Sequence, residues 1–216
     1  MLICPENISK WSIYLNSNED KLIGISHADI VTLACKLKVS AIQLTDKLAS
    51  PNSLYETAFC LRKITKDFGI PFIINDRLDI ANAILADGLH IGQEDIPIAV
   101  ANKLINDDML LSVTCNNIDQ VIESEKCLCD FIKIGPFYEE NFEGKSIKND
   151  ESYQLLFEIK KISNLPIIGF GDFNKDNVKT ALDEGINCIS ITPKGNNLEK
   201  IENNICEIKS VLENII

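Results

Sequence analysis

Short apolar runs alternate with longer amphipathic segments along most of this chain. Runs of a few apolar residues are typical of buried strands in a parallel sheet. We expect eight strands, at Ser12–Leu15, Ala41–Thr45, Pro71–Asn75, Gly88–Gly92, Leu110–Thr114, Phe131–Gly135, Pro166–Phe170 and Cys188–Ile191. Apolar residues at helical spacing predict helices that include Ala28–Leu37, Ser53–Phe68, Leu78–Leu85, Ile118–Lys126, Ser152–Ile162, Lys175–Glu184 and Leu198–Ile216.

Strands that alternate with helices indicate βαβ units and a parallel sheet. A length of 216 residues suits one domain with a sizeable core. An open flavodoxin-like sheet would leave three of the eight strands unplaced, whereas a closed barrel uses all of them. The pattern therefore predicts an α/β fold, a single (β/α)8 TIM barrel domain over residues 1–216.

Residues at the predicted helix ends support these boundaries. Ser53 and Glu56 have the spacing of a capping box. Asp150 or Glu151 can cap the helix that precedes Pro166. Gly69 and Gly185 each follow a helical segment and precede a strand, as C-terminal stops do.

The composition excludes several classes of partner. The formal net charge is −11, and no basic block stands out to neutralise nucleic-acid phosphates. No apolar run approaches the ~20 residues of a membrane span, and the N-terminus has no basic-then-apolar signal. We expect a soluble, cytoplasmic protein without a nucleic-acid or membrane partner. An acidic protein of this kind needs local cations to bind an anionic substrate.

The eight cysteines are spread along the chain, and only Cys127 and Cys129 lie close together. Several fall inside apolar runs, where Cys behaves as a small hydrophobe. We expect reduced core thiols rather than disulfides or a zinc site, as is usual in the cytosol.

Carboxylates follow two consecutive predicted strands almost at once. Asp76 comes directly after Pro71–Asn75, and Asp95 follows Gly88–Gly92. Ligands of α/β proteins sit at the carboxyl ends of the strands, so Asp76 and Asp95 would face one pocket if the two strands are neighbours. Paired carboxylates suit a hard cation such as Mg²⁺. This pattern points to an enzyme that acts on a phosphorylated small molecule.

Other polar residues mark the same ends of neighbouring strands. Alternation along the second strand places Gln43, Thr45 and Lys47 on one side, where they could bind a diphosphate or simply form a solvated strand end. Asn75-Asp76 is also a common helix cap, and a His such as His90 in an apolar strand is often a core residue. Further strand ends carry Thr114 and Gly171. Together they form the pattern of a barrel enzyme.

The order of four motifs resembles thiamine phosphate synthase and its TenI-like relatives. The motifs are Q-L-x-x-K from Gln43, I-N-D-R from Ile74, A-D-G-x-H-x-G-Q-x-D from Ala86, and I-G-P-F from Ile134. The resemblance implies a (β/α)8 barrel that couples hydroxymethylpyrimidine diphosphate to thiazole phosphate, releasing thiamine phosphate and pyrophosphate. It implies a dissociative step in which Mg²⁺ draws off pyrophosphate and the thiazole nitrogen captures a pyrimidine carbocation.

The resemblance also implies roles for individual residues. Asp76 and Asp95 would bind Mg²⁺. The catalytic residues would be Lys47, Asn75, Thr114 and Lys145. The substrate-binding set would comprise Gln43, Thr45, Lys47, Asn75, His90, Thr114, Lys145 and Gly171. Barrels of this family are often dimers, so a homodimer is an open expectation.

The chain departs from the family pattern mainly at its phosphate-binding positions. Thr45 stands where the family has an arginine, which would give a bidentate contact to the diphosphate. Carboxylates replace the threonines before Lys145, in the stretch Glu139–Glu143. Asp172 replaces the second glycine of a Gly-Gly pair, and Pro193, which lacks an N–H, stands in a Val-Ser pair.

These departures leave two interpretations open. One is a divergent thiamine phosphate synthase. The other is a repurposed TenI-like barrel that binds another phosphorylated ligand with weak or no turnover. A TenI-like tautomerase would place its general-base histidine near Asn116, and Asn cannot accept the proton. The longest polar break, Tyr138–Asp150, is either a lid over the site or an ordinary surface loop.

Overall fold

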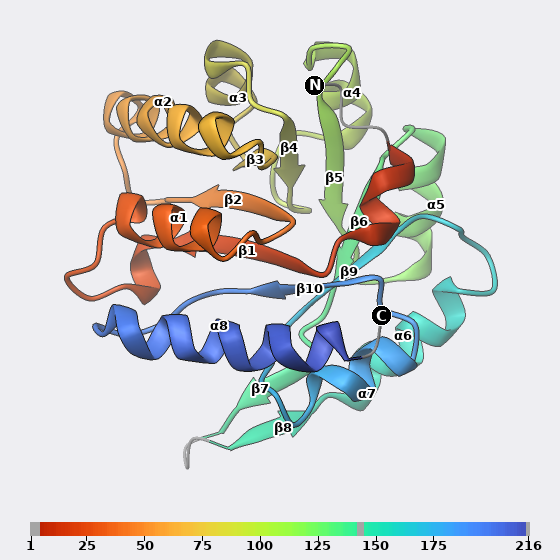
Figure 1. Ribbon diagram of the computed structural model, residues 1–216. Helices are drawn as coiled ribbons and strands as arrows, with labels where there is room; N and C mark the ends of the chain where they lie inside the picture. The colour runs from red at the N-terminus through yellow and green to blue at the C-terminus, as the bar shows by residue number, and fades with distance from the viewer. Residues whose placement is uncertain (1–4, 142–144, 215–216) are drawn as a thin grey trace.

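The computed structural model describes residues 5–141 and 145–214, and in it eight parallel strands close into a barrel (Figure 1). The order around the barrel is β1-β10-β9-β6-β5-β4-β3-β2. The fold predicted from the alternating pattern is therefore confirmed. The strands are β1 (Ile13–Asn18), β2 (Ala41–Thr45), β3 (Phe72–Asn75), β4 (Gly88–Ile91), β5 (Leu110–Thr114), β6 (Phe131–Ile134), β9 (Ile167–Phe170) and β10 (Cys188–Ile191).

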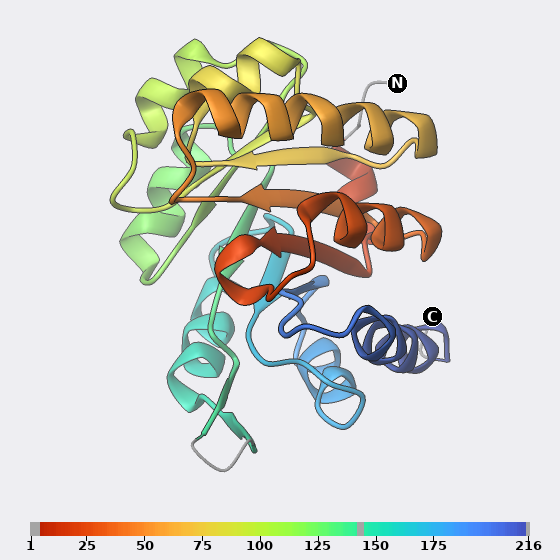
Figure 2. The ribbon, with the colours of Figure 1, turned by 90° about the vertical axis from the view of Figure 1, so that its left-hand side faces the viewer.

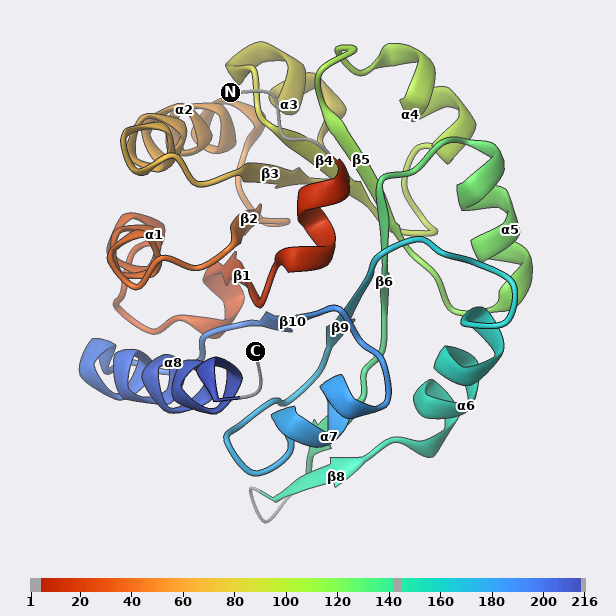
Figure 3. The ribbon, with the colours of Figure 1, turned by 45° about the vertical axis from the view of Figure 1, so that its right-hand side comes forward.

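Eight α-helices surround the barrel as an outer ring, which Figures 2 and 3 show from two sides. They are α1 (His27–Lys36), α2 (Pro51–Phe68), α3 (Leu78–Ile84), α4 (Ile98–Leu104), α5 (Ile118–Lys126), α6 (Asp150–Ile159), α7 (Val178–Asp183) and α8 (Leu198–Glu213). Two 3₁₀ helices, η1 (Pro5–Lys10) and η2 (Glu19–Lys21), flank β1. No helix among the described residues is long and apolar enough to cross a membrane.

The apolar core has two parts because alternate residues of each strand face opposite sides of the sheet. The larger part fills the layer between the strands and the helices. The smaller part fills the inside of the barrel at the amino ends of the strands, where η1 lies across the opening (Figure 3). It consists of Ile8, Trp11, Tyr14, Ala41, Ile73, Leu110, Phe131, Ile168 and Cys188. This plug leaves only the carboxyl ends of the strands for a binding site.

The helix caps differ in part from those expected. Helix α2 begins two residues earlier than predicted: Ser50 is its N-cap and accepts a hydrogen bond from the Ser53 N–H, so the proposed Ser53 cap is wrong. Pro51 occupies the first helical turn, where its missing N–H costs nothing. Asn149, not Asp150 or Glu151, caps α6. Gly69 ends α2 in the left-handed conformation, with φ of 67°, as predicted.

The segment Tyr138–Asp150 is more ordered than a plain loop. Its described part contains two paired antiparallel strands, β7 (Tyr138–Glu140) and β8 (Ser146–Lys148), and residues 142–144 lie outside the described part of the chain. The Ser146 hydroxyl donates to the Asp172 carbonyl, and the Asn149 N–H donates to the Phe137 carbonyl. The first bond attaches the hairpin of β7 and β8 to the loop after β9, and the second joins the two ends of the hairpin.

Seven cysteines fall in the described part of the chain, and none of them forms a disulfide there. Cys35, Cys115, Cys129 and Cys188 are buried thiols, as expected. Cys60 and Cys206 are exposed on helices, so the prediction of a core position is wrong for these two. Cys4 lies outside the described residues.

Candidate active site

The barrel register gathers the polar strand-end residues around one cavity. Asn75 on β3 is level with His90 on β4, and Thr114 on β5 is level with Lys133 on β6. The cavity has a volume of about 250 Å³. Its lining is Asn16, Gln43, Thr45, Lys47, Asn75, Asp76, His90, Gly92, Thr114, Lys133, Phe170, Ser190 and Thr192. We call this cavity the donor pocket.

Most residues that the sequence singled out line the donor pocket, but three do not. Asp95 borders a neighbouring cavity, and its carboxyl group contacts that of Asp76. Gly171 lines a second cavity. Lys145 directly precedes β8, and its N–H donates to the Asn141 side chain. Lys145 is not among the residues that line the donor pocket.

Asp76 is held at the mouth of the donor pocket in an unusual backbone conformation. Its φ is 63°, and its N–H donates to the His90 carbonyl over 2.8 Å. A left-handed Asp is uncommon, and such strained residues gather at functional sites. The Lys47 ammonium lies 2.9 Å from the Asp76 carboxylate. This contact holds the pKa of Lys47 above its usual range.

Asp76 and Asp95 form a pair suited to a divalent cation. Burial, followed by the neighbouring Asp95 carboxyl, raises the pKa of Asp76 to about 6, although Lys47 opposes this. Asp95 in turn accepts a hydrogen bond of 2.6 Å from the Gly92 N–H. No cluster of three or more potential metal ligands occurs among the described residues. Two carboxylates fit Mg²⁺ nonetheless, because Mg²⁺ usually combines one or two carboxylates with substrate phosphates and water.

Gln43 holds the base of the donor pocket together. Its carbonyl oxygen accepts from the Tyr14 hydroxyl at 2.6 Å and from the Lys133 ammonium at 3.2 Å. Its amide donates to Asn75 at 2.8 Å and to Thr45 at 3.0 Å. All of its hydrogen-bonding capacity is thus used within the protein. Here Gln43 positions Asn75 instead of offering a free amide to a diphosphate.

His90 is buried in the wall of the donor pocket between two hydroxyls. Its Nδ1 lies 2.9 Å from the Ser112 hydroxyl and its Nε2 lies 3.0 Å from the Thr114 hydroxyl. Burial lowers the pKa of His90 well below its usual range, and the charges of Lys133 and Lys47 lower it further. His90 is therefore a neutral imidazole at neutral pH, and it holds Thr114 in place.

Lys133 is a site residue that the sequence analysis left out of the predicted set. It is 5 % exposed, it projects inside the barrel, and its Nζ lies 4.7 Å from the centre of the Tyr14 ring. No carboxylate among the described residues pairs with it, and burial lowers its pKa to about 7. The one available signal was a lysine inside the apolar run Phe131–Ile134.

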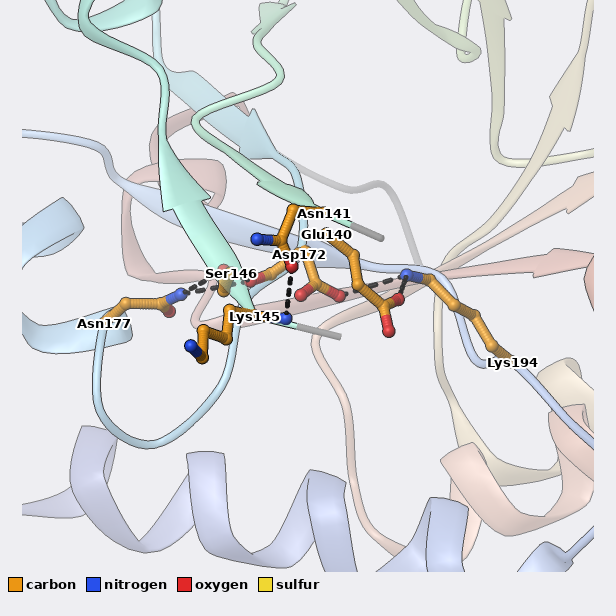
Figure 4. A network of polar contacts seen from close by, with 7 residues as sticks. All are labelled: Glu140, Asn141, Lys145, Ser146, Asp172, Asn177 and Lys194. Atoms are coloured by element: carbon orange, nitrogen blue, oxygen red, sulfur yellow. Dashed lines mark hydrogen bonds and ion pairs between the residues drawn. The ribbon is translucent and has the colours of Figure 1, made fainter. Parts of the chain in front are cut away.

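A larger cavity of about 650 Å³ adjoins the donor pocket and shares Phe170 and Thr192 with it. We call it the acceptor pocket. Its lining is Asn18, Lys21, Tyr138, Glu139, Glu140, Phe170, Gly171, Asp172, Phe173, Ile191, Thr192, Pro193, Lys194, Lys200, Ile201, Asn204 and Ile205. The Lys194 ammonium lies 3.1 Å from both Glu140 and Asp172 (Figure 4).

Comparison with known proteins identifies the family. The model of the thiamine monophosphate synthase family matches residues 13–193. The chain belongs to this family. A thiamine-phosphate synthase of Clostridium botulinum is 32% identical over 97% of this chain and 98% of its own length. A thiamine-phosphate synthase of Clostridium acetobutylicum is 37% identical over 73% of this chain and 74% of its own.

A solved structure supports the fold of this thiamine monophosphate synthase family member. The thiamine phosphate pyrophosphorylase of Pyrococcus furiosus has a TM-score of 0.78 and is 24% identical, covering 95% of this chain and 98% of that one. Of the residues that the resemblance implied, those that line the donor pocket are Gln43, Thr45, Lys47, Asn75, Asp76, His90 and Thr114. The departures from the family pattern cluster in the acceptor pocket, apart from Thr45.

Proposed function

We propose that the chain couples hydroxymethylpyrimidine diphosphate to thiazole phosphate, with thiamine phosphate and pyrophosphate as products. The observation that carries this proposal is the Asp76–Asp95 pair beside Lys47 at the mouth of a polar pocket. That arrangement can receive a diphosphate, and family membership over residues 13–193 supports the reaction.

The donor pocket would hold the pyrimidine and its leaving group. Asp76 and Asp95 would hold Mg²⁺, which supplies charge neutralisation for the departing pyrophosphate. Lys47 would bind a diphosphate oxygen from the same edge of the pocket. Asn75 would orient the substrate, because Gln43 fixes its side chain through a 2.8 Å hydrogen bond.

The neutral state of His90 suits a dissociative reaction. Loss of pyrophosphate leaves positive charge on the pyrimidine methylene group, and a cationic neighbour would oppose this. The pKa of His90 lies well below its usual range, so the ring adds no charge. The thiazole nitrogen would then attack from the acceptor pocket, which opens beside Phe170 and Thr192.

The test is a turnover assay with purified protein, Mg²⁺ and both substrates, following thiamine phosphate as fluorescent thiochrome. We expect product from the unaltered chain and none from Asp76→Ala. Asp79→Ala is the matched control, because Asp79 is 64% exposed and pairs with Arg77 away from the pocket. Equal activity in Asp76→Ala and the unaltered chain would contradict the site.

Magnesium binding is tested separately from turnover. Asp76→Ala and Asp95→Ala should each abolish Mg²⁺-dependent binding of the pyrimidine diphosphate in calorimetry. Each change removes a charged ligand from a site with two. Unchanged affinity in either folded variant would refute the metal assignment.

The second interpretation, a repurposed barrel, is favoured by Thr45. Its hydroxyl donates to Asn16 over 2.8 Å and accepts from Gln43. The Thr45 side chain is therefore hydrogen-bonded within the protein instead of to a diphosphate. Thr45→Arg should tighten diphosphate binding about tenfold if the pocket still receives a diphosphate. Diphosphate binding without product in the turnover assay would identify the repurposed barrel.

We also propose that the protein works in the cytoplasm. The acidic composition and the phosphorylated small-molecule substrates of the family agree with a cytoplasmic enzyme. A homodimer is the oligomeric state expected from the family. Sedimentation of the purified chain would distinguish a monomer from a dimer.

A further inference from the structure

The acceptor pocket is electrically balanced. Three lysines and three carboxylates line it: Lys21, Lys194, Lys200, Glu139, Glu140 and Asp172. Lys194 lies 3.1 Å from a carboxylate oxygen of Glu140 and 3.1 Å from one of Asp172 (Figure 4). These two contacts raise the pKa of Lys194 against the opposing effect of burial. A dianionic phosphate placed there would compete with both carboxylates for this cation.

Three backbone N–H groups around the pocket donate within the protein. The Asp172 N–H donates to the Tyr138 carbonyl over 2.8 Å. The Phe173 N–H donates to Gly171, and the Gly195 N–H donates to Lys21. Pro193 has no N–H to give. Phosphate sites in barrels rely on such amides in the last two βα loops and at a helix N-terminus.

Gly171 serves the packing of the hairpin rather than an open cradle. A Cβ atom at Gly171 would lie 2.8 Å from the Tyr138 nitrogen and 2.9 Å from its oxygen. Its φ of 151° also favours glycine. The backbone of β7 therefore packs directly against Gly171, where a side chain would collide with Tyr138.

We infer that this acceptor pocket does not select for a phosphate group and that the chain also couples the unphosphorylated thiazole alcohol, giving thiamine itself. This inference rests on the proposed function and specifies its acceptor. The bond-forming step is unchanged: the thiazole nitrogen attacks the pyrimidine methylene carbon, and pyrophosphate leaves with the bonding electrons. Only the group on the acceptor's side chain differs.

The walls of the pocket fit such an acceptor. Phe170, Phe173 and Ile191 offer apolar surface for a thiazole ring. At the polar end, Asp172 and Glu140 can accept a hydrogen bond from an alcohol, whereas they would repel a phosphate. Lys194 would stay on its two carboxylates when the alcohol binds, so no ion pair has to break.

The experiment compares kcat/KM for the alcohol and the phosphate with the full chain, Mg²⁺ and pyrimidine diphosphate, separating thiamine from thiamine phosphate by chromatography. A site built for a polar group rejects analogues that lack it by about 10⁴ or more. We expect the two values to lie within about tenfold of each other, because few selective contacts are available. A preference for the phosphate above about a hundredfold would overturn the inference, since that needs several dedicated contacts.

Two substitutions test whether the charge of Asp172 is the reason that the pocket does not select for a phosphate. Asp172→Gly and Asp172→Asn each remove the charge, and the second preserves side-chain size in case the first fails to fold. Either should shift the acceptor ratio towards the phosphate by about tenfold, because one repelling carboxylate is gone and Lys194 is left with Glu140 as its only carboxylate partner among the described residues. Asp176→Asn, on the same loop but exposed and away from the pocket, should leave the ratio unchanged.

The outcomes separate the two proposals. Product from the phosphate alone would overturn this inference and uphold the proposed function. No product from either acceptor would overturn both. Product from both acceptors, with an unchanged ratio in a folded Asp172 variant, would remove Asp172 as the specificity residue and overturn the stated cause.

Discussion

Replacing Lys133 with Met should stabilise the protein at pH 7. The pKa of Lys133 falls from 10.5 to about 7, chiefly through burial. Above pH 7 the unfolded chain keeps a proton on this lysine that the folded chain releases. The free energy of unfolding therefore rises with pH between about 7 and 10.5 on account of this group. Methionine has a similar length and carries no charge to bury.

The size of the expected stabilisation follows from the lowered pKa of Lys133. A difference of this size corresponds to about 4 kcal/mol of lost stability at pH 7 and about 2 kcal/mol at pH 9. The hydrogen bond to Gln43 and the contact with the Tyr14 ring offset part of the gain, at about 1 kcal/mol each. Gln43 keeps its 2.6 Å bond from Tyr14 in the variant. We expect a net gain of about 2 kcal/mol at pH 7, which disappears by pH 9.

Urea unfolding at pH 7 and pH 9 measures this gain. Trp11 is the sole tryptophan of the chain, and its ring centre lies 5.7 Å from Phe131 and 6.2 Å from Tyr14, below Lys133. Its fluorescence therefore reports on the part of the barrel interior that lies next to Lys133. The midpoint should rise by about 1 M at pH 7, for a slope of about 2 kcal/mol/M.

The control is Lys103→Met on α4, where the lysine is exposed. Its unfolding midpoint should stay within experimental error of the unaltered chain at both pH values. If Lys133→Met gained equally at pH 7 and pH 9, or destabilised the protein at both, the buried-charge explanation would be refuted.

Two further substitutions test the framework around the site. Asp87→Ala should cost about 2–3 kcal/mol in urea unfolding, because it leaves the half-buried Arg62 and a backbone N–H of β3 without their acceptor; a loss below 0.5 kcal/mol, no more than a typical surface substitution, would show that the pair adds little. Gly171→Ala should lower the unfolding temperature by several degrees, since its Cβ would meet the Tyr138 backbone. Gly24→Ala is the control: Gly24 also has a positive φ, but an added Cβ meets no atom there, so this variant measures backbone strain without a steric clash.

The barrel could be predicted because each strand and helix carries its own local signal. Buried strands such as β9 are continuous apolar runs, and Gly69 marks the end of α2. The short hairpin strands β7 and β8 carry no such signal, since they are polar and only three residues long. Their pairing depends on contacts with the loop after β9, which are distant in sequence.

Most residues of the donor pocket could be predicted from the sequence, but the hydrogen bonds between them could not. Strand ends predict that Gln43, Asn75 and His90 share one edge, because parallel strands in a barrel end together. A sequence does not say which hydrogen bonds they form, and Gln43 proves to be saturated by protein partners. Lys133 was left out of the predicted site residues because an apolar run with one lysine does not reveal which face the lysine occupies.

The two pockets differ in how the fold fixes them, and this explains where the chain departs from its family. Donor-pocket residues such as Asn75 and Thr114 stand on barrel strands, where the register sets their positions. A change there disturbs neighbours on both sides. Acceptor-pocket residues such as Asp172 and Lys194 stand on connections, which tolerate substitution without loss of the barrel. We therefore expect acceptor specificity to shift through a few charges on these connections, whereas Asn75 and Thr114 are constrained by the register of their strands.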